Sequence, residues 1–216
     1  MADEALVWAP AAELTEARES FQDDAPHRVY RAVRTALDPV LALPMLMVCL
    51  PVFIAIAVGI RLDSAGPTFF RQQRVGRSGK PFTIWKFRTL TMNAPTYSLK
   101  VAEHHPVVTR FGRFLRRTGL DELPQLLNVV RGDMALIGPR PEQIGLIHLY
   151  EPWQLRRLLL KPGITGWWQI HHRDGVPLHL NVDKDLFYIN NQGVWIDLLI
   201  VLGTFKVVLG SIAAAF

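Results

Sequence analysis

Two apolar runs dominate the pattern of hydrophobic and polar positions along the chain. Residues 39–60 contain no charged side chain, and residues 198–216 contain only Lys206. A helix over the 22 residues of the first run would be about 33 Å long, enough to cross a hydrocarbon core of about 30 Å. Both runs therefore predict helices that contact a membrane. The second run is at the lower end of the spanning length, so its residues leave open another span and a helix that lies at the membrane surface or packs on the core, with its lysine reaching toward the interface.

Prolines interrupt the first run. Pro44 and Pro51 lack the N–H that would bond the carbonyl one turn earlier, so we expect a break or a sharp kink. Bent at Pro51, each arm would be about 15 to 18 Å long, too short to cross a bilayer alone. Arginines flank the run on both sides, namely Arg28, Arg31 and Arg34 before it and Arg61, Arg71 and Arg74 after it. Because arginine favours the cytoplasmic side, the pattern leaves open a kinked span and a re-entrant helix that leaves by the face it entered.

A short β-hairpin is predicted after the first run. Residues 68–72 and 82–87 have the composition of strands, and the Gly-rich segment 76–81 between them is typical of a turn. Side chains alternate between the two faces of a strand, so Lys86 and Arg88 are expected to share one face.

The distribution of charge suggests anionic partners. The chain carries 24 Lys and Arg against 19 Asp and Glu, for a formal net charge of +5, yet its first 26 residues hold seven acidic side chains and one arginine. The remainder is therefore strongly basic, which suits phosphorylated substrates, anionic lipid headgroups or nucleic acid. No nucleic-acid-binding motif accompanies this charge, so we expect no nucleic-acid partner. The acidic segment 1–30 contains no candidate site.

A pair of adjacent carboxylates, Asp121 and Glu122, stands in the segment TGLDELPQL. Two like charges in a partly buried place repel and are costly to desolvate, so they need nearby cations, a metal ion or a catalytic role. Pro124 predicts that the pair lies at or near the start of a helix, where the dipole favours an ionised carboxylate. Four arginines precede the pair, Arg110, Arg113, Arg116 and Arg117. Two interpretations remain open from the residues alone: a structural ion-pair cluster, and a catalytic pair in which one carboxylate attacks and the other holds a divalent cation.

Three longer motifs resemble a known family. KFRT at 86–89, LDELPQLLNVVRGDMALIGPRP at 120–141 and KPGITGWWQI at 161–170 are similar to the bacterial sugar transferases, the monotopic phosphoglycosyl transferases. The resemblance runs from about residue 34 to residue 206. It implies a monotopic enzyme of the bacterial inner membrane, with a re-entrant helix and an active site on the cytoplasmic face. Such enzymes move a sugar phosphate from a UDP-sugar to a polyprenol phosphate such as undecaprenyl phosphate and release UMP, initiating an exopolysaccharide, O-antigen, capsule or glycoprotein glycan.

The resemblance also implies roles for individual residues. Asp121 corresponds to the nucleophile that forms an aspartyl-phosphosugar intermediate, and Glu122, with Asp121, to the binding site for Mg²⁺. Four basic residues correspond to positions that bind the substrate phosphates: Lys86, Arg88, Arg116 and Arg140. Cations in these places would stabilise the charge of a transferring phosphoryl group.

This chain departs from the family pattern in three places, the first being that only Arg34 stands near Asp38 where the family usually has a basic pair. Leu50 precedes Pro51 at the membrane bend, where the family usually has serine. Leucine cannot bond a freed backbone carbonyl, so the bend needs another source of support. The segment after Trp168 also differs from the family, so the sugar is not implied. The expected sugar or nucleotide region holds Gln169, Arg173 and Asp185.

Together these observations predict an α+β fold that is mainly helical. We expect an acidic extension at 1–30, a re-entrant helix-break-helix at 31–62, and a catalytic domain at 63–216 with a β-hairpin, surface amphipathic helices and a membrane-associated C-terminal helix. The expected partners are a UDP-sugar, a polyprenol phosphate, the lipid bilayer and a second copy of the chain in a homodimer. The alternative function is a catalytically silent membrane scaffold for glycan-assembly partners.

Overall fold

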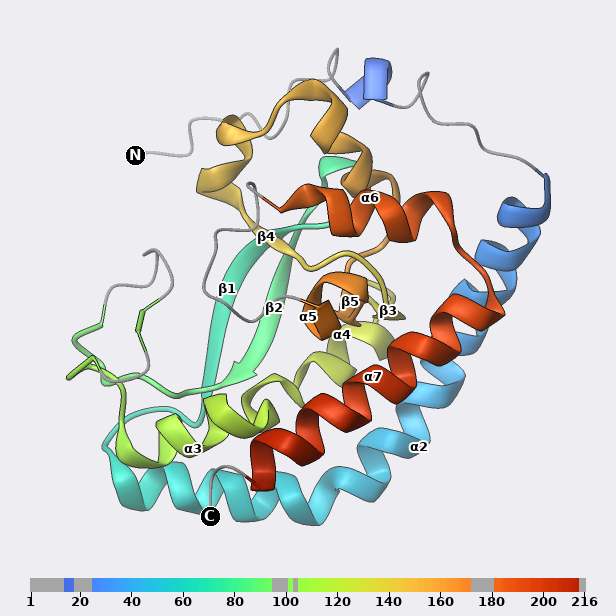
Figure 1. Ribbon diagram of the computed structural model, residues 1–216. Coiled ribbons are helices and arrows are strands. Elements are labelled where there is room, and N and C mark those ends of the chain that lie inside the picture. The colour runs from blue at the N-terminus through green and yellow to red at the C-terminus, as the bar shows by residue number, and fades with distance from the viewer. Residues whose placement is uncertain (1–13, 18–24, 95–100, 103–104, 172–180, 214–216) are drawn as a thin grey trace.

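The computed structural model describes residues 14–17, 25–94, 101–102, 105–171 and 181–213. Over these residues the fold is mainly helical with two small sheets, which confirms the predicted class (Figure 1). The principal helices are α2 (Ala25–Asp63), α3 (Arg110–Thr118), α4 (Gln125–Val130), α5 (Trp167–His171), α6 (Val182–Asn190) and α7 (Val194–Ala213). The strands are β1 (Phe69–Val75), β2 (Pro81–Phe87), β3 (Ala135–Ile137), β4 (Glu142–Gln143) and β5 (Gly163–Thr165). Short 3₁₀ segments are η1 (Arg77–Gly79), η2 (Leu120–Glu122), η3 (Ile144–Leu149) and η4 (Pro152–Leu159).

The long helix α2 takes up the first apolar run. It is hydrogen-bonded over 39 residues, with Pro39, Pro44 and Pro51 inside it. Figure 1 shows that it changes direction in its middle part, between a blue arm along one side of the molecule and a cyan arm along its base. The expected interruption is therefore a bend within a continuous helix, which follows from the missing proline N–H groups. How the two arms lie in a bilayer stays a prediction.

The hairpin is confirmed and has a third strand. β1 and β2 pair antiparallel with Phe70 opposite Lys86, and β4 pairs antiparallel with the other edge of β1. β3 and β5 form a separate parallel pair. Gly163 allows this pair to close, because a Cβ at this position would lie 2.0 Å from the Gly138 nitrogen. Since β3 and β4 follow each other closely in the sequence, the two sheets fix both ends of the segment 138–141.

One buried side chain joins α4 to the hairpin. Asn128 is fully buried; its Oδ1 accepts a hydrogen bond from the Trp85 N–H at 3.1 Å, and its Nδ2 donates to the Thr83 carbonyl at 2.7 Å. The amide thus completes the backbone pairing of β2. Leu126 and Val129 of α4 pack in the same place against apolar residues of α2 and β2. This junction fixes the distance between the start of α4 and the end of β2.

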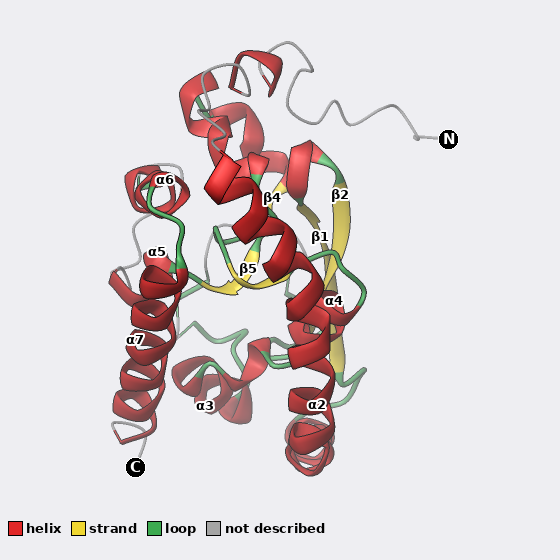
Figure 2. Ribbon diagram, turned by 90° about the vertical axis from the view of Figure 1, so that its right-hand side faces the viewer, coloured by secondary structure: helices red, strands yellow, loops and turns green. Residues whose placement is uncertain are grey.

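Two helices present long apolar surfaces. His27–Asp63 and Val194–Ser211 are long and apolar enough to cross a membrane. The most apolar 18-residue stretch of each has a mean hydropathy of 2.7 and 1.8, respectively, and only 17% and 6% of it is buried within the fold. A core helix of a soluble domain would be mostly buried, so neither helix serves as one. Figure 2 shows α2 and α7 on opposite sides of α3, and α3 packs against both.

Candidate active site

The turn that carries Asp121 and Glu122 lies between α3 and α4. α3 ends at Thr118, and Gly119 follows with a φ of 74°, a left-handed conformation that favours glycine. The Glu122 N–H then bonds the Gly119 carbonyl at an N···O distance of 3.1 Å and closes η2. Because Pro124 caps α4, the pair stands in a separate turn at the N-terminal end of this helix. The predicted position near the start of a helix is thus confirmed, with the pair just ahead of the first α-helical turn.

Glu122 is held by two cations from distant parts of the chain. Its Oε1 lies 2.6 Å from Lys86 Nζ on β2 and 3.1 Å from Arg140 Nη2 on the segment after β3. Burial alone would raise the pKa of Glu122, but the attraction of Lys86 and Arg140 outweighs it and holds this pKa well below its ordinary value. Glu122 is therefore ionised throughout the physiological pH range.

Asp121 is in a different electrostatic situation. Within the described part of the chain its carboxylate makes no hydrogen bond and no ion pair. Burial, together with the negative charge of Glu122, raises its pKa from 3.8 to about 6, although nearby Lys86 and Arg116 oppose the rise. The two adjacent carboxylates thus have pKa values displaced in opposite directions.

Arg116 lies in the last turn of α3. Its Nε donates to Thr89 Oγ1 at 2.9 Å, and its Nη1 donates to the Val101 carbonyl at 3.1 Å. Its charge also lowers the pKa of Asp121, which places it in the electrostatic environment of the pair. The structure therefore brings together four of the residues expected at the site, Lys86, Asp121, Glu122 and Arg140. Arg116 lies beside them.

Arg88 has other contacts. Its side chain is buried, and its three guanidinium nitrogens donate to the carbonyls of Pro67, Ala65 and Ser64 at 2.7 to 2.9 Å. These contacts tie the end of β2 to the segment that follows α2. Arg88 was expected to share a strand face with Lys86, but β2 ends at Phe87 and the Arg88 guanidinium bonds this backbone instead.

Asp185 also differs from the expectation. Its side chain is 1% exposed, and its Oδ2 pairs with Arg157 Nη2 at 2.6 Å. Burial raises the pKa of Asp185, and the Arg157 guanidinium opposes the rise. Asp185 is therefore placed to hold Arg157 rather than to touch a ligand. Arg173, the other basic residue expected near the sugar, lies outside the described residues.

A large cavity opens beside the carboxylate pair. Its volume is about 1800 Å³, and its polar wall contains the carboxylates, their cations and Gln169. The buried Trp168 Nε1 and Gln169 Oε1 have no hydrogen-bond partner among the described residues, and the Arg140 guanidinium lies 5.7 Å from the Trp168 ring centroid. A different part of the wall is apolar and comes from α2 and α7, including Leu37, Leu41, Met45, Val201 and Phe205.

The carboxylates of the site can be compared with the ligands that the predicted Mg²⁺ would need. No group of three or more His, Cys, Asp or Glu side chains that could hold a metal occurs in the described part of the fold. Mg²⁺ commonly uses one or two carboxylates and completes its octahedron with water and substrate phosphates. Both cations contact Oε1 of Glu122, and no ion pair to its Oε2 occurs among the described residues. The residues fit a Mg²⁺ that is completed by a phosphorylated substrate.

Comparison with known proteins places the chain in a family. The model of the bacterial sugar transferase family matches residues 29–211. The chain belongs to this family.

Several curated relatives match over most of the chain. It is 36% identical to the UDP-N-acetylgalactosamine-undecaprenyl-phosphate N-acetylgalactosaminephosphotransferase of Aeromonas hydrophila, over 88% of this chain and 46% of that protein. It is 41% identical to the UDP-glucose:undecaprenyl-phosphate glucose-1-phosphate transferase of Escherichia coli K12, over 82% of this chain and 40% of that protein. The uncharacterized sugar transferase EpsL of Bacillus subtilis is 40% identical over 77% of this chain and 82% of its own length. The chain thus spans less than half of the first two relatives.

Some residues that shape the site were not expected from the sequence. Asn128 and Arg157 are buried polar residues with backbone or ionic partners. Asn128 and Arg157 fall in stretches of mixed polarity, and their partners are distant in sequence. The two arginines among the leucines of residues 155–160 give the only signal, because a buried arginine requires a partner.

Proposed function

We propose that this protein transfers a sugar phosphate from a UDP-sugar to a polyprenyl phosphate, with release of UMP. The observation that carries the proposal is the contrast between the two carboxylates: Asp121 has no ion pair or hydrogen bond among the described residues, whereas Glu122 is fixed by Lys86 and Arg140 at 2.6 and 3.1 Å. A nucleophile needs a free lone pair, whereas a metal-binding carboxylate benefits from a fixed position. Family membership and the names of the relatives support the same reaction.

In the first half-reaction the Asp121 carboxylate attacks the phosphorus that bears the sugar. A bond forms between the Asp121 oxygen and phosphorus, the bond from phosphorus to the UMP oxygen breaks, and UMP carries away the electron pair. The guanidinium of Arg140 and the ammonium of Lys86 face the charge that develops on the phosphoryl oxygens. Mg²⁺ bound at Glu122 would neutralise charge on the diphosphate.

In the second half-reaction a phosphate oxygen of the polyprenyl phosphate attacks the same phosphorus. The bond to Asp121 breaks, and the carboxylate is regenerated. The apolar wall supplied by α2 and α7 supports a place for the isoprenoid chain next to the polar wall. Burial of an alkyl or isoprenoid chain there contributes roughly 0.8 kcal/mol per CH₂ group.

The membrane arrangement completes the proposal. The exposed apolar surfaces of α2 and α7 support insertion in the bilayer, and a re-entrant α2 would leave the active site on the cytoplasmic face of the bacterial inner membrane. This location suits an acceptor whose tail stays in the bilayer while its phosphate reaches the cavity.

Purified protein in nanodiscs tests the proposal. It is incubated with Mg²⁺, undecaprenyl phosphate and a panel of UDP-sugars, and UMP is separated from UDP. We expect UMP with at least one donor and none from Asp121→Asn. UDP as product would mean ordinary glycosyl transfer. Absence of both nucleotides with every donor, together with retained binding of other membrane proteins, would favour the silent scaffold.

A further inference from the structure

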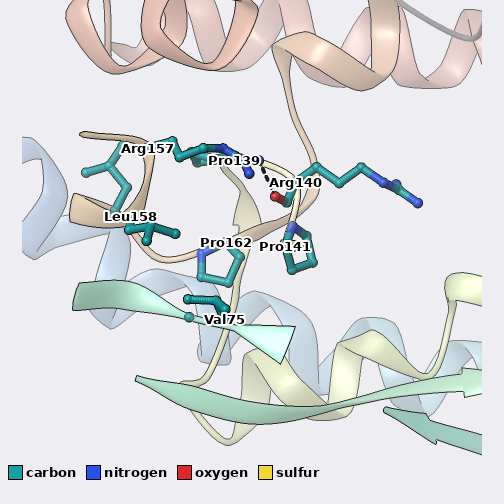
Figure 3. Close-up of a pocket in the computed structure, with 9 residues that line it drawn as sticks. Val75, Pro139, Arg140, Pro141, Arg157, Leu158 and Pro162 are labelled. Carbon is teal, nitrogen blue, oxygen red and sulfur yellow. Dashed lines mark hydrogen bonds between the residues drawn. The ribbon is translucent and has the colours of Figure 1, made fainter. Parts of the chain in front are cut away.

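The segment that carries Arg140 is held by an arginine near each end, the partly buried Arg34 and the buried Arg157. Arg34 Nη2 donates to the Ile137 carbonyl at 2.5 Å, and Arg157 Nη2 donates to the Arg140 carbonyl at 2.5 Å. Figure 3 shows the second contact, with the Arg140 side chain pointing away from Arg157. Asp38 adds to the first anchor by accepting a hydrogen bond from the Leu136 backbone. The backbone is thereby fixed on both sides of residues 138 and 139.

One short helix holds both arginines. Asp185 of α6 accepts from Arg157 Nε at 3.0 Å and from Nη2 at 2.6 Å. Tyr188, one turn later on α6, accepts from Arg34 Nη1 at 2.5 Å. Residues three apart share a helix face, so the same face of α6 serves both anchors. Asp185 and Tyr188 are each 1% exposed.

Residues of other elements complete the hydrogen bonding around Arg34, Arg157, Asp185 and Tyr188, a set that we call the polar layer. Asp197 of α7 accepts from Tyr188 Oη at 2.9 Å and pairs with Arg34 Nε at 3.1 Å. Arg157 Nη1 donates to Tyr150 Oη, which in turn donates to Glu142. Buried ion pairs contribute little net stability, because desolvation offsets their attraction. Holding the backbone in a fixed position therefore accounts for the polar layer better than a contribution to stability does.

We infer that Asp185 and Tyr188 are positioning residues for Arg140. They fix Arg34 and Arg157, these arginines fix the backbone at Ile137 and Arg140, and the Arg140 guanidinium is thereby set beside Glu122 and the Trp168 ring. Arg140 also lines the cavity. The catalytic consequence rests on the proposed phosphosugar transfer, in which Arg140 stabilises phosphoryl charge.

The conservative substitution Tyr188→Phe tests this inference. It removes the hydroxyl that accepts from Arg34 and keeps the ring, so the fold is retained. We expect kcat for UMP release to fall about tenfold with little change in KM for the UDP-sugar, since misplacement affects the transition state more than ground-state binding. Ile189→Val is the matched control, because it trims a buried neighbour on α6 that forms no part of the polar layer. It should leave kcat unchanged.

A double-mutant cycle identifies Arg140 as the residue through which Tyr188 acts. In an Arg140→Lys background the additional loss from Tyr188→Phe should be less than about twofold, whereas in a Lys86→Arg background it should remain about tenfold. Equal losses in all backgrounds, or an equal loss from Ile189→Val, would overturn the inference and indicate a general effect on the fold.

Crystal structures of the wild type, Tyr188→Phe and Ile189→Val provide a readout that needs no activity. We expect the Arg140 to Glu122 contact, 3.1 Å here, to be lost or displaced in Tyr188→Phe alone. An unchanged contact would contradict the inference. Failure of the proposed function is distinct, because in that case the wild type forms no UMP while the displacement of Arg140 is still observed.

Discussion

Replacement of Asp121 by asparagine is expected to stabilise the fold at neutral and alkaline pH. The structure raises the pKa of this carboxyl from 3.8 to about 6, chiefly through burial. The folded state therefore binds the Asp121 proton more tightly than the unfolded state does. Ionisation of Asp121 within the fold costs free energy, and an uncharged amide of the same shape avoids that cost.

The magnitude follows from the two pKa values. Each pKa unit corresponds to about 1.4 kcal/mol, so a rise from 3.8 to about 6 gives a cost of about 3 kcal/mol at pH values above 6. As the pH falls from 6 toward 3.8 the folded carboxyl becomes protonated and the cost declines. About half of it remains at pH 5, and little remains at pH 4. For a chain of this size the full difference corresponds to a rise in Tm of roughly 6 to 12 °C.

Thermal unfolding of the wild type and Asp121→Asn in detergent, between pH 4 and pH 8, measures this difference. We expect the Tm of the variant to exceed that of the wild type at pH 8 and to approach it as the pH is lowered. Glu122→Gln serves as the control with the opposite sign, because the pKa of Glu122 is depressed and its ionised form stabilises the fold. A variant with the wild-type Tm at pH 8, or with a gain that grows toward pH 4, would refute the reasoning.

Three further results are expected. The kcat/KM for UMP release should rise with pH through about 6 and then level off, because the nucleophile must be ionised; a pH-independent profile would contradict an attacking Asp121. Asp185→Asn should lower the free energy of unfolding in urea by about 3 to 5 kcal/mol by leaving the buried Arg157 charge unpaired; a loss below about 1 kcal/mol would argue against this pair. Gly119→Ala should cost about 1 kcal/mol in the same assay and reduce turnover, because Gly119 has a φ of 74°; a neutral effect would show that the turn tolerates a Cβ.

The sequence predicted the parts of the fold that have a clear local pattern. The hairpin followed from alternation and its Gly-rich turn, and the apolar runs correspond to α2 and α7. The parallel pair β3 and β5 could not be predicted in the same way, because its strands have three residues each and a period of two needs a longer run to be visible. The bend of α2 followed from its prolines, whereas its continuity reflects hydrogen bonding that the sequence pattern does not specify.

For the candidate site, the sequence predicted the residues of the long motifs but not the partners of every charged side chain. The adjacent carboxylates and the family motifs identified Asp121, Glu122, Lys86 and Arg140 before their contacts were known. Arg88 and Asp185 show the limit, because each has the residue type of a ligand-binding group but is directed to a protein partner. Which partner a charged side chain takes depends on tertiary packing, and the motif alone does not determine it.

Capture of the covalent intermediate tests the central claim most directly. Purified protein is mixed with Mg²⁺ and a UDP-sugar that supports UMP release, without polyprenyl phosphate, and its intact mass is measured together with the UMP formed. We predict one equivalent of UMP, a mass increase of one sugar phosphate on a peptide that contains Asp121, and loss of the adduct when undecaprenyl phosphate is added. UMP formed only after the acceptor is added, with no adduct under any condition, would contradict attack by Asp121 and indicate direct transfer between the two substrates.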